Sequence, residues 1–261
     1  MIDSHCHLEQ NDFEKDLDEI IEKCKESGIL AIITSCTHPS DFERTMEIVN
    51  KYENYVFASV GIHPEYIKEI NEEAKENFLK LIEENKEKVV SIGEIGLDYF
   101  WIKEERWRKK QRELFVEMLE FAKKLKKPVT VHLREAYEDG LKILEDSGIK
   151  RVHLHMFNNP KLVEKVVENE WYVSIGPIIL RNKTNRKVAK KMPMNKLLLE
   201  TDAPWNSPKR ILEGIKDRND PTSIKIVARK IAEVRKSNFD EIWKICAKNA
   251  IELFNLPISL P

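Results

Sequence analysis

The amino-acid sequence predicts an α/β protein built as one closed (β/α)8 barrel, the TIM-barrel architecture, over residues 1–261. Three observations lead to this fold class. Short β-branched runs alternate along the chain with charged stretches of helical periodicity. Eight such units fit into 261 residues, a length typical of one barrel domain. No Pro-, Gly- or Ser-rich linker divides the chain, and the G-x-G-x-x-G fingerprint of an open doubly wound sheet does not occur.

The eight predicted strands are short, apolar and rich in β-branched residues. In chain order they are Ile2–His7, Leu30–Cys36, Val56–His63, Val89–Leu97, Val129–Leu133, Val152–Phe157, Tyr172–Ile179 and Lys196–Thr201. Because a helical stretch separates each strand from the next, we expect consecutive strands to pair in parallel through right-handed crossovers.

The predicted helices carry apolar residues at helical spacing, with Glu and Lys on the opposite face. Phe13–Ser27 and Phe42–Tyr52 show this pattern early in the chain, and Ile224–Arg235 and Phe239–Phe254 supply the last two helices. Such helices can bury one face against the outside of a barrel while the other face contacts water.

The composition excludes several classes of protein. The chain has 44 Lys and Arg against 45 Asp and Glu, and its net charge of −1 argues against a globally basic nucleic-acid-binding protein. A local basic patch remains compatible with this balance. Hydrophobic residues make up 41%, enough for a full core. The longest apolar run, Ile29–Ile33, is far shorter than the roughly 18 residues that a membrane span needs.

The start of the chain and its cysteines indicate a cellular location. Met1 leads directly into a predicted strand, without the basic and apolar regions of a secretory signal. The four cysteines form no C-x-x-C pair, so neither a disulfide framework nor a zinc ribbon is predicted. We therefore expect a cytoplasmic protein with no membrane association, and the sequence gives no sign of an obligate protein partner.

Titratable residues gather at the ends of the predicted strands. The active sites of barrel enzymes lie where the C-terminal ends of the strands meet, so these side chains are expected to share one mouth. In order of the strands they are Asp3, His5 and His7, then His63, then Glu94 and Asp98, then His132 and Arg134, then His155, and finally Glu200 and Asp202.

His5 and His7 form the first candidate metal-binding pair. Residues two apart share a face of a strand, so both imidazoles can bind one divalent cation. The alternative is a polar strand end in which the two rings serve only packing. The convergence of His132, His155 and Asp202 on the same mouth favours the metal site. Imidazole and carboxylate ligands suit Zn²⁺, Mn²⁺ or Mg²⁺, and the sequence does not choose among them.

Two further positions each allow two interpretations. His153 and His155 have the same strand parity, but His155 lies closer to the mouth, and a hydrogen-bonded core role is expected for His153. Glu94 lies on an otherwise apolar strand between glycines that permit close backbone approach. Burying this acid is costly unless it is paired or binds a metal. We interpret Glu94 as a metal-bridging carboxylate, and a structural ion pair is the alternative.

Eight short motifs follow one another from residue 2 to about residue 256. They are D-S-H-C-H at 3–7, G-I-H-P at 61–64, G-E-I-G-L-D-Y at 93–99, H-L-R at 132–134, H-M-F at 155–157, E-T-D-A-P at 200–204, R-N-D-P at 218–221 and N-A-I-E-L-F at 249–254. In this order they resemble the motifs of the TatD-like metal-dependent hydrolases, a branch of the amidohydrolase superfamily. The resemblance covers nearly the whole chain.

This resemblance implies a barrel hydrolase with two divalent metal cations. By motif position, one cation would be held by His5, His7, Glu94 and Asp202, and the other by Glu94, His132 and His155. Known members include deoxyribonucleases that act on DNA ends. The leading expectation is therefore phosphodiester hydrolysis, with DNA as the substrate.

The predicted catalytic residues are Asp202, Glu94, Arg134 and His63. Asp202 would orient the attacking water and accept its proton. Arg134 would bind phosphate, because a guanidinium matches phosphate with two parallel hydrogen bonds; a rim salt bridge to Glu94 or Glu135 is the alternative. His63 would contact the leaving group or the phosphate, or would support a ligand from behind.

Two supporting sets of residues complete the predicted site. Asp3, Asp98 and Glu200 are expected to hold the imidazoles in the metal-binding tautomer. The segment 181–191 has six basic residues and no acid, so it either tracks a phosphate backbone or forms a solvated helix face. The indole rings that follow strand ends can stack on bases or pack against helices, and they are Trp101, Trp107 and Trp205.

Two other functions are compatible with the same residues. The same metal site would serve an amide or ester hydrolase, for example one that cleaves an acyl ester from an RNA end. Related amidohydrolases often bridge their metals with a carboxylated lysine on the fourth strand, where this chain has Glu94 and no lysine. A non-catalytic relic barrel is the other alternative, and the complete set of candidate ligands argues against it.

Overall fold

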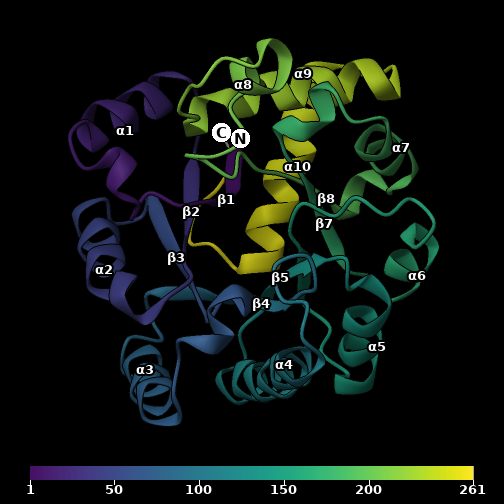
Figure 1. Cartoon of the computed structure of the whole chain (residues 1–261). Coiled ribbons are helices and arrows are strands. Elements are labelled where there is room, and N and C mark those ends of the chain that lie inside the picture. The colour runs from purple at the N-terminus through teal and green to yellow at the C-terminus, as the bar shows by residue number, and fades with distance from the viewer. Residues whose placement is uncertain (261) are drawn as a thin grey trace.

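The computed structural model describes residues 1–260, and its eight strands form one parallel sheet in the order β1 to β8 (Figure 1). Pro261, the last residue of the predicted domain, lies outside the described residues. The strands are β1 (Ile2–Cys6), β2 (Ala31–Cys36), β3 (Val56–Val60), β4 (Val89–Asp98), β5 (Val129–Arg134), β6 (Val152–Leu154), β7 (Tyr172–Ile175) and β8 (Leu197–Leu199).

Backbone hydrogen bonds join the first strand to the chain just after the last one. The Asp202 N–H donates to the His5 carbonyl oxygen at 3.0 Å, and the His7 N–H donates to the Ala203 carbonyl oxygen at 2.7 Å. The ring of strands therefore closes, and the structure confirms the predicted (β/α)8 barrel.

The helices lie mostly around the outside of the barrel (Figure 1). They are α1 (Leu17–Glu26), α2 (Phe42–Lys51), α3 (Glu72–Glu84), α4 (Glu105–Leu125), α5 (Tyr137–Ser147), α6 (Val163–Glu168), α7 (Lys183–Lys191), α8 (Pro208–Glu213), α9 (Ile224–Arg235) and α10 (Phe239–Phe254). Short 3₁₀ turns lie at Asn11–Phe13, Pro39–Asp41, Pro64–Lys68, Pro177–Leu180, Met194–Lys196 and Pro221–Ser223.

Several predicted strands are too long at their C-terminal ends. The third ends at Val60, the sixth at Leu154 and the seventh at Ile175. The prediction for the seventh strand is wrong beyond that point because Pro177 begins a 3₁₀ turn. Proline has no backbone N–H for a neighbouring strand. Ile179 is buried without strand pairing, and Ile178 and Leu180 are half-buried.

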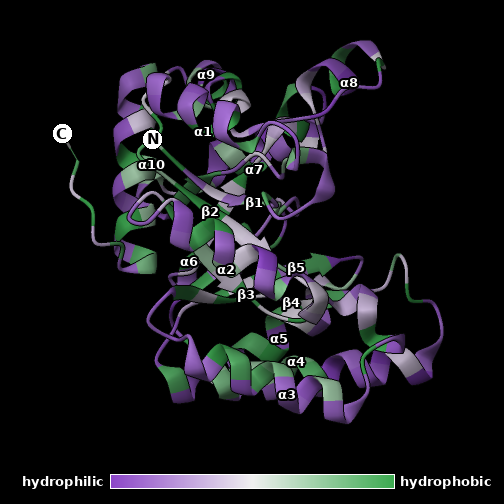
Figure 2. Ribbon diagram, turned by 90° about the vertical axis from the view of Figure 1, so that its left-hand side faces the viewer, coloured by the Kyte–Doolittle hydropathy of each residue, from purple (hydrophilic) through white to green (hydrophobic). Residues whose placement is uncertain are grey.

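Helix α10 closes the N-terminal end of the barrel, where the strands begin. Ala250, Leu253 and Phe254 of this helix form a buried cluster with Ile2 and Phe57, which lie near the starts of their strands. Figure 1 shows this helix across the area that the strands surround, and Figure 2 shows it at one end of the barrel. The N-terminal end of the barrel is therefore plugged, whereas the polar strand ends collect at the opposite end.

The surface follows the amphipathic pattern of the sequence. Figure 2 shows hydrophilic residues along the outward faces of the helices, and α8 projecting from the body of the protein. None of the helices in residues 1–260 combines the length and the apolar character needed to cross a bilayer.

Candidate metal centre

Irregular backbone shapes the strand ends that carry the predicted ligands. The pairing register of β1 with β2 shifts between Asp3 and Cys6, and that of β4 with β5 shifts between Ile92 and Ile95. Such shifts redirect side chains at the rim of a barrel. At the second shift Gly93 precedes Glu94, and a Cβ atom on Gly93 would lie 2.4 Å from the Thr130 carbonyl oxygen. Only glycine allows this approach.

Glu94 lies at the middle of the centre, where its carboxylate faces imidazoles from four other strand ends. It is buried, with 4% of its side chain exposed. Its Oε2 is 3.3 Å from His5 Nε2, and its Oε1 is 2.8 Å from His132 Nδ1. The same Oε1 is 3.5 Å from His63 Nε2 and 3.7 Å from His155 Nε2. One carboxylate can therefore contact two groups of ligands at once.

The imidazoles are anchored through the ring nitrogen that faces away from Glu94. His7 Nδ1 donates to the Ser35 carbonyl oxygen at 3.0 Å. His155 Nδ1 donates to Glu200 Oε2 at 2.9 Å, and His132 Nε2 donates to Asp98 Oδ2 at 2.9 Å. These acceptors cannot donate, so they fix the tautomer of each neutral ring. The nitrogen that faces the centre then carries a lone pair.

The arrangement of donor atoms fits divalent cations. The Nε2 atoms of His5 and His7 lie 3.1 Å apart, close to the spacing of two ligands on one cation with metal–nitrogen bonds of about 2.0–2.1 Å. Three groups of side chains bring one ligand atom each within 4.8 Å of one another. They are His5, His155 and Asp202; His5, His7 and Glu94; and His63, Glu94 and His132.

Electrostatics in the centre favour positive charge. Burial alone would raise the pKa of Glu94, but the charges of His155, His63 and His5 outweigh it and hold that pKa well below its usual range. Burial likewise opposes protonation of His155, yet Glu200 and Glu94 raise its pKa to about 9. The ionised carboxylates therefore favour positive charge beside them, which either a proton on an imidazole or a bound cation can supply.

Asp202 lies beside the first histidine pair. Its Oδ1 is 3.6 Å from His7 Nε2 and 3.8 Å from His5 Nε2, and its Oδ2 accepts a hydrogen bond from Asn206 at 2.7 Å. Burial raises the pKa of Asp202, but the neighbouring His7 and the charge of His155 outweigh burial and hold that pKa below its usual range. Asp202 is therefore an ionised group that reaches the centre.

His63 and Arg134 line the cavity above the centre, whose volume is about 410 Å³. His63 Nδ1 accepts a hydrogen bond from the Glu65 N–H at 3.2 Å, which directs its Nε2 toward Glu94. The Arg134 guanidinium lies 3.8 Å from the centre of the Phe100 ring. Among residues 1–260 it has no carboxylate within 4.0 Å, so the rim salt bridge considered for Arg134 does not form.

The supporting acids behave in two ways. Asp98 and Glu200 hold imidazoles, as described above. Asp3 does not: its Oδ2 accepts from the Thr201 hydroxyl at 2.5 Å and its Oδ1 accepts from the Thr201 N–H at 3.0 Å. The expectation for Asp3 is therefore wrong. This acid ties β1 to the chain after β8, where the ring of strands closes.

Sequence reasoning missed two supporting residues on the β1 side. Glu9 Oε1 lies 3.2 Å from His7 Nδ1, and Glu9 Oε2 accepts from the Thr34 hydroxyl at 2.7 Å. Ser35 Oγ lies 3.0 Å from His5 Nδ1. Glu9 comes two positions after His7, so the alternation that identified His5 and His7 could have found it. Ser35 gave no signal, because one buried serine on an apolar strand has no characteristic spacing.

His153 lies deeper in the barrel than His155. Its Nε2 is 2.7 Å from Ser174 Oγ, and its Nδ1 is 3.4 Å from Thr130 Oγ1. Ser174 in turn donates to Glu200 Oε2 at 2.7 Å. His153 therefore supports the acid that anchors His155 and does not face Glu94.

The mouth of the cavity carries exposed aromatic rings. Trp101 is 55% exposed, Trp205 is 44% exposed, and both line the cavity, whereas Trp107 lies on α4 outside it. In the basic segment 181–191, half of the cationic side chains donate to backbone carbonyls. Arg181 bonds to Ile211, Arg186 to Ile179, and Lys191 to Pro160, with the remaining lysines directed to the surface of α7.

The closed parallel barrel and the imidazole–carboxylate cluster at its mouth define the class of the protein: it is a metal-dependent hydrolase of the barrel type. The family model described as TatD related DNase matches residues 2–255. The chain belongs to this family, which confirms the resemblance seen in its motifs.

Individual relatives show the same match over nearly full length. The chain is 31% identical to human deoxyribonuclease TATDN3 over 263 residues, which cover 97% of this chain and 94% of the relative. It is 33% identical to the metal-dependent hydrolase YabD of Bacillus subtilis strain 168 over 261 residues, covering 98% and 99%. The crystal structure of the TatD homologue YJJV from Escherichia coli K12 superposes with a TM-score of 0.88 at 28% identity, covering 98% of both chains.

Proposed function

We propose that this protein is a phosphodiesterase that removes residues from the ends of DNA with the help of two divalent cations. The observation that carries the proposal is the position of Glu94, whose two oxygens face different groups of imidazoles. In this proposal His5, His7, Glu94 and Asp202 hold one cation, Glu94, His132 and His155 hold the other, and Zn²⁺, Mn²⁺ and Mg²⁺ are all compatible with the ligands. When bound, such a pair of cations lowers the pKa of a water molecule and neutralises charge on the phosphate.

The acidic residues of the site have two different roles in this proposal. Asp202 Oδ1 would orient the attacking water and take up its proton, because this carboxylate is ionised and reaches the centre from the side of His7. Asp98 and Glu200 keep His132 and His155 in the tautomer that leaves a lone pair toward the centre. These residues hold the geometry before substrate arrives, which is the condition for effective electrostatic catalysis.

Arg134 and His63 would bind the phosphate group. The Phe100 ring supports the Arg134 guanidinium from one face, which leaves its N–H groups free for two parallel bonds to phosphate oxygens. His63 Nε2 points into the cavity beside Glu94, where it can contact the phosphate or the leaving group.

Exposed rings at the mouth favour a nucleic acid over a small ester. Trp101 and Trp205 line the cavity and present apolar faces on which bases can stack. The lysines on the free surface of α7 add positive charge for a phosphate backbone.

A panel of substrates tests the proposal. Metal-loaded protein is assayed on single-stranded DNA, RNA, a chromogenic phosphodiester and aryl esters. We expect cleavage of DNA and of the phosphodiester, and loss of turnover in Glu94→Ala and His132→Ala while both variants still unfold cooperatively. Faster turnover of aryl esters would instead identify an amide or ester hydrolase. Absence of any metal-restored activity would identify a relic barrel.

A further inference from the structure

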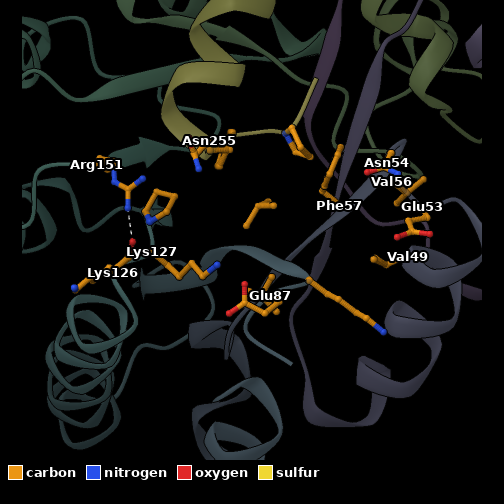
Figure 3. A pocket seen from close by; sticks show the side chains of 16 residues that line it. Val49, Glu53, Asn54, Val56, Phe57, Glu87, Lys126, Lys127, Arg151 and Asn255 are labelled. Carbon is orange, nitrogen blue, oxygen red and sulfur yellow. Dashed lines mark hydrogen bonds between the residues drawn. The ribbon is translucent and has the colours of Figure 1, made fainter. Parts of the chain in front are cut away.

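A second cavity of about 410 Å³ lies at the N-terminal end of the barrel, opposite the metal centre (Figure 3). Its walls come from the loops that precede β3, β4, β5 and β6, together with the chain that follows α10. Within residues 1–260, none of the side chains that line this basal cavity also lines the cavity above the metal centre. The proposed function therefore makes no use of it.

Positive charge in the basal cavity exceeds negative charge. Four cationic side chains face two carboxylates, and they are Lys88, Lys126, Lys127 and Arg151 against Glu53 and Glu87. In the described part of the chain, no ion pair within 4.0 Å involves any of these six. Lys88 donates to Asn50 Oδ1 at 2.7 Å, and Arg151 donates to the Lys126 carbonyl oxygen. Lys88 and Arg151 thus bond to neutral oxygens, and within residues 1–260 none of the four cations has a carboxylate at ion-pair distance.

Lys127 is the member of this group that is half-buried. Figure 3 shows its side chain extending into the cavity on the side of Glu87. Its ammonium has no hydrogen-bond acceptor within residues 1–260. Burial lowers the pKa of Lys127, the charge of Arg151 lowers it further, and Glu87 only partly offsets this. A desolvated ammonium without a partner is costly, and an anion bound beside it would remove that cost.

The rest of the wall is suited to an organic group. Phe57, Phe254 and Pro257 contribute apolar surface, and Asn54 and Asn255 place side-chain amides beside it. Amides can donate to and accept from hydroxyl groups. Inorganic phosphate would contact only the cationic side chains and would leave the apolar and amide part of the wall unused. A ligand that uses the whole cavity combines a phosphate with a part that is both apolar and hydroxylated.

We propose that the basal cavity binds a small phosphate monoester, with Lys127 and Arg151 contacting the phosphate and the wall around Phe57 and Phe254 contacting the organic part. Nucleoside monophosphates and sugar phosphates share this chemistry. The site is separate from the metal centre, so the proposal does not depend on the hydrolase function.

Calorimetric titration of the metal-loaded full chain tests this proposal. The probes are adenosine monophosphate, ribose 5-phosphate and inorganic phosphate. We expect saturable binding of at least one monoester. Lys127→Met and Arg151→Met should each weaken it about tenfold or more, the effect of losing a charged hydrogen bond. The control Lys80→Met removes an exposed lysine of α3 outside the cavity and should leave affinity unchanged. All three variants should keep the hydrolysis rate of the unmodified chain.

The other outcomes of the titration either identify the class of ligand or overturn the proposal. Tighter binding of the nucleotide than of ribose 5-phosphate identifies a nucleotide site, and equal binding of the two identifies a sugar-phosphate site. Inorganic phosphate that binds as tightly as both monoesters overturns the role of the apolar wall. Binding that survives in Lys127→Met and Arg151→Met but disappears in His132→Ala places the ligand at the metal centre and overturns the proposal. So does the absence of saturable binding by all three probes.

Discussion

The variant Glu200→Gln removes the negative charge that contacts His155, a candidate metal ligand. The volume of the side chain at position 200 stays nearly the same. Glu200 Oε2 accepts from His155 Nδ1 at 2.9 Å and from Ser174 Oγ at 2.7 Å, and Oε1 accepts from the Met156 N–H at 2.9 Å. A glutamine has one oxygen and one NH₂ group. Whichever way the amide turns, its NH₂ group faces at least one of these donors.

The cost of this variant can be estimated from the bonds that it breaks. One charge-assisted hydrogen bond contributes about 1.5–3 kcal/mol. If His155 instead changes its tautomer to accept from the amide, its Nε2 gains a proton and can no longer bind a cation. Both routes predict metal affinity about 10- to 100-fold weaker, the usual effect of removing such a partner.

The assay is competition with a metal-binding dye, using Mn²⁺ or Zn²⁺ and the metal-free protein. Glu164→Gln, a change on the exposed surface of α6, is the matched control and should bind metal like the unmodified chain. Thermal unfolding of the metal-free variants shows whether the fold is intact. Unchanged metal affinity in a folded Glu200→Gln protein would refute the assignment of His155 as a ligand held by Glu200.

Three further predictions address the mouth, the barrel wall and the surface. Arg134→Met should raise KM for DNA about tenfold with little change in kcat, because one charged contact to phosphate is lost; steady-state kinetics measure this. Gly93→Ala should lower the free energy of unfolding in urea by about 1–3 kcal/mol or more, since its Cβ would meet the Thr130 carbonyl oxygen. Asp16→Asn should cost about 1 kcal/mol at pH 7, because Asp16 forms a two-bonded pair with the half-buried Arg218. The Arg218 guanidinium holds the pKa of Asp16 below its value in the unfolded chain, so this stabilisation is present above about pH 4 and disappears as the pH falls through the folded-state pKa.

Matched variants separate these effects from general damage. Lys103→Met removes another cation near the mouth, one that pairs with Glu135 at 3.4 Å, and should leave KM unchanged. Gly148→Ala lies at the C-terminal end of α5 with no atom within 4 Å of the added Cβ, so its cost comes from the backbone alone. If the unmodified chain and Asp16→Asn still differed in stability at a pH below the folded-state pKa of Asp16, the ion pair would not explain the difference.

The fold could be predicted because each strand–helix unit repeats one pattern. Val89–Asp98 and Val129–Arg134 are apolar and β-branched, and Ile224–Arg235 and Phe239–Phe254 carry clear helical periodicity. The prediction was wrong where apolar residues are buried or half-buried without strand pairing. The run after Pro177 continues as apolar sequence, but it turns into a 3₁₀ segment since proline cannot donate to the neighbouring strand.

The candidate site could be predicted in part because parallel strands end at one mouth. His5 and Glu94 therefore lie together although 88 residues separate them in the sequence. The supporting contacts could not be predicted in the same way. Which acid anchors which ring depends on the register shifts in β1 and β4, and Asp3 bonds to Thr201 rather than to an imidazole because it lies at the closure of the ring.

Anomalous X-ray diffraction from a crystal of the protein grown with Mn²⁺ shows directly whether Glu94 bridges two cations. We predict two anomalous peaks at the C-terminal end of the barrel, both within bonding distance of the Glu94 carboxylate, one beside His5 and His7 and the other beside His132. Well-ordered side chains with no peak between them, or peaks that do not contact Glu94, would contradict the account.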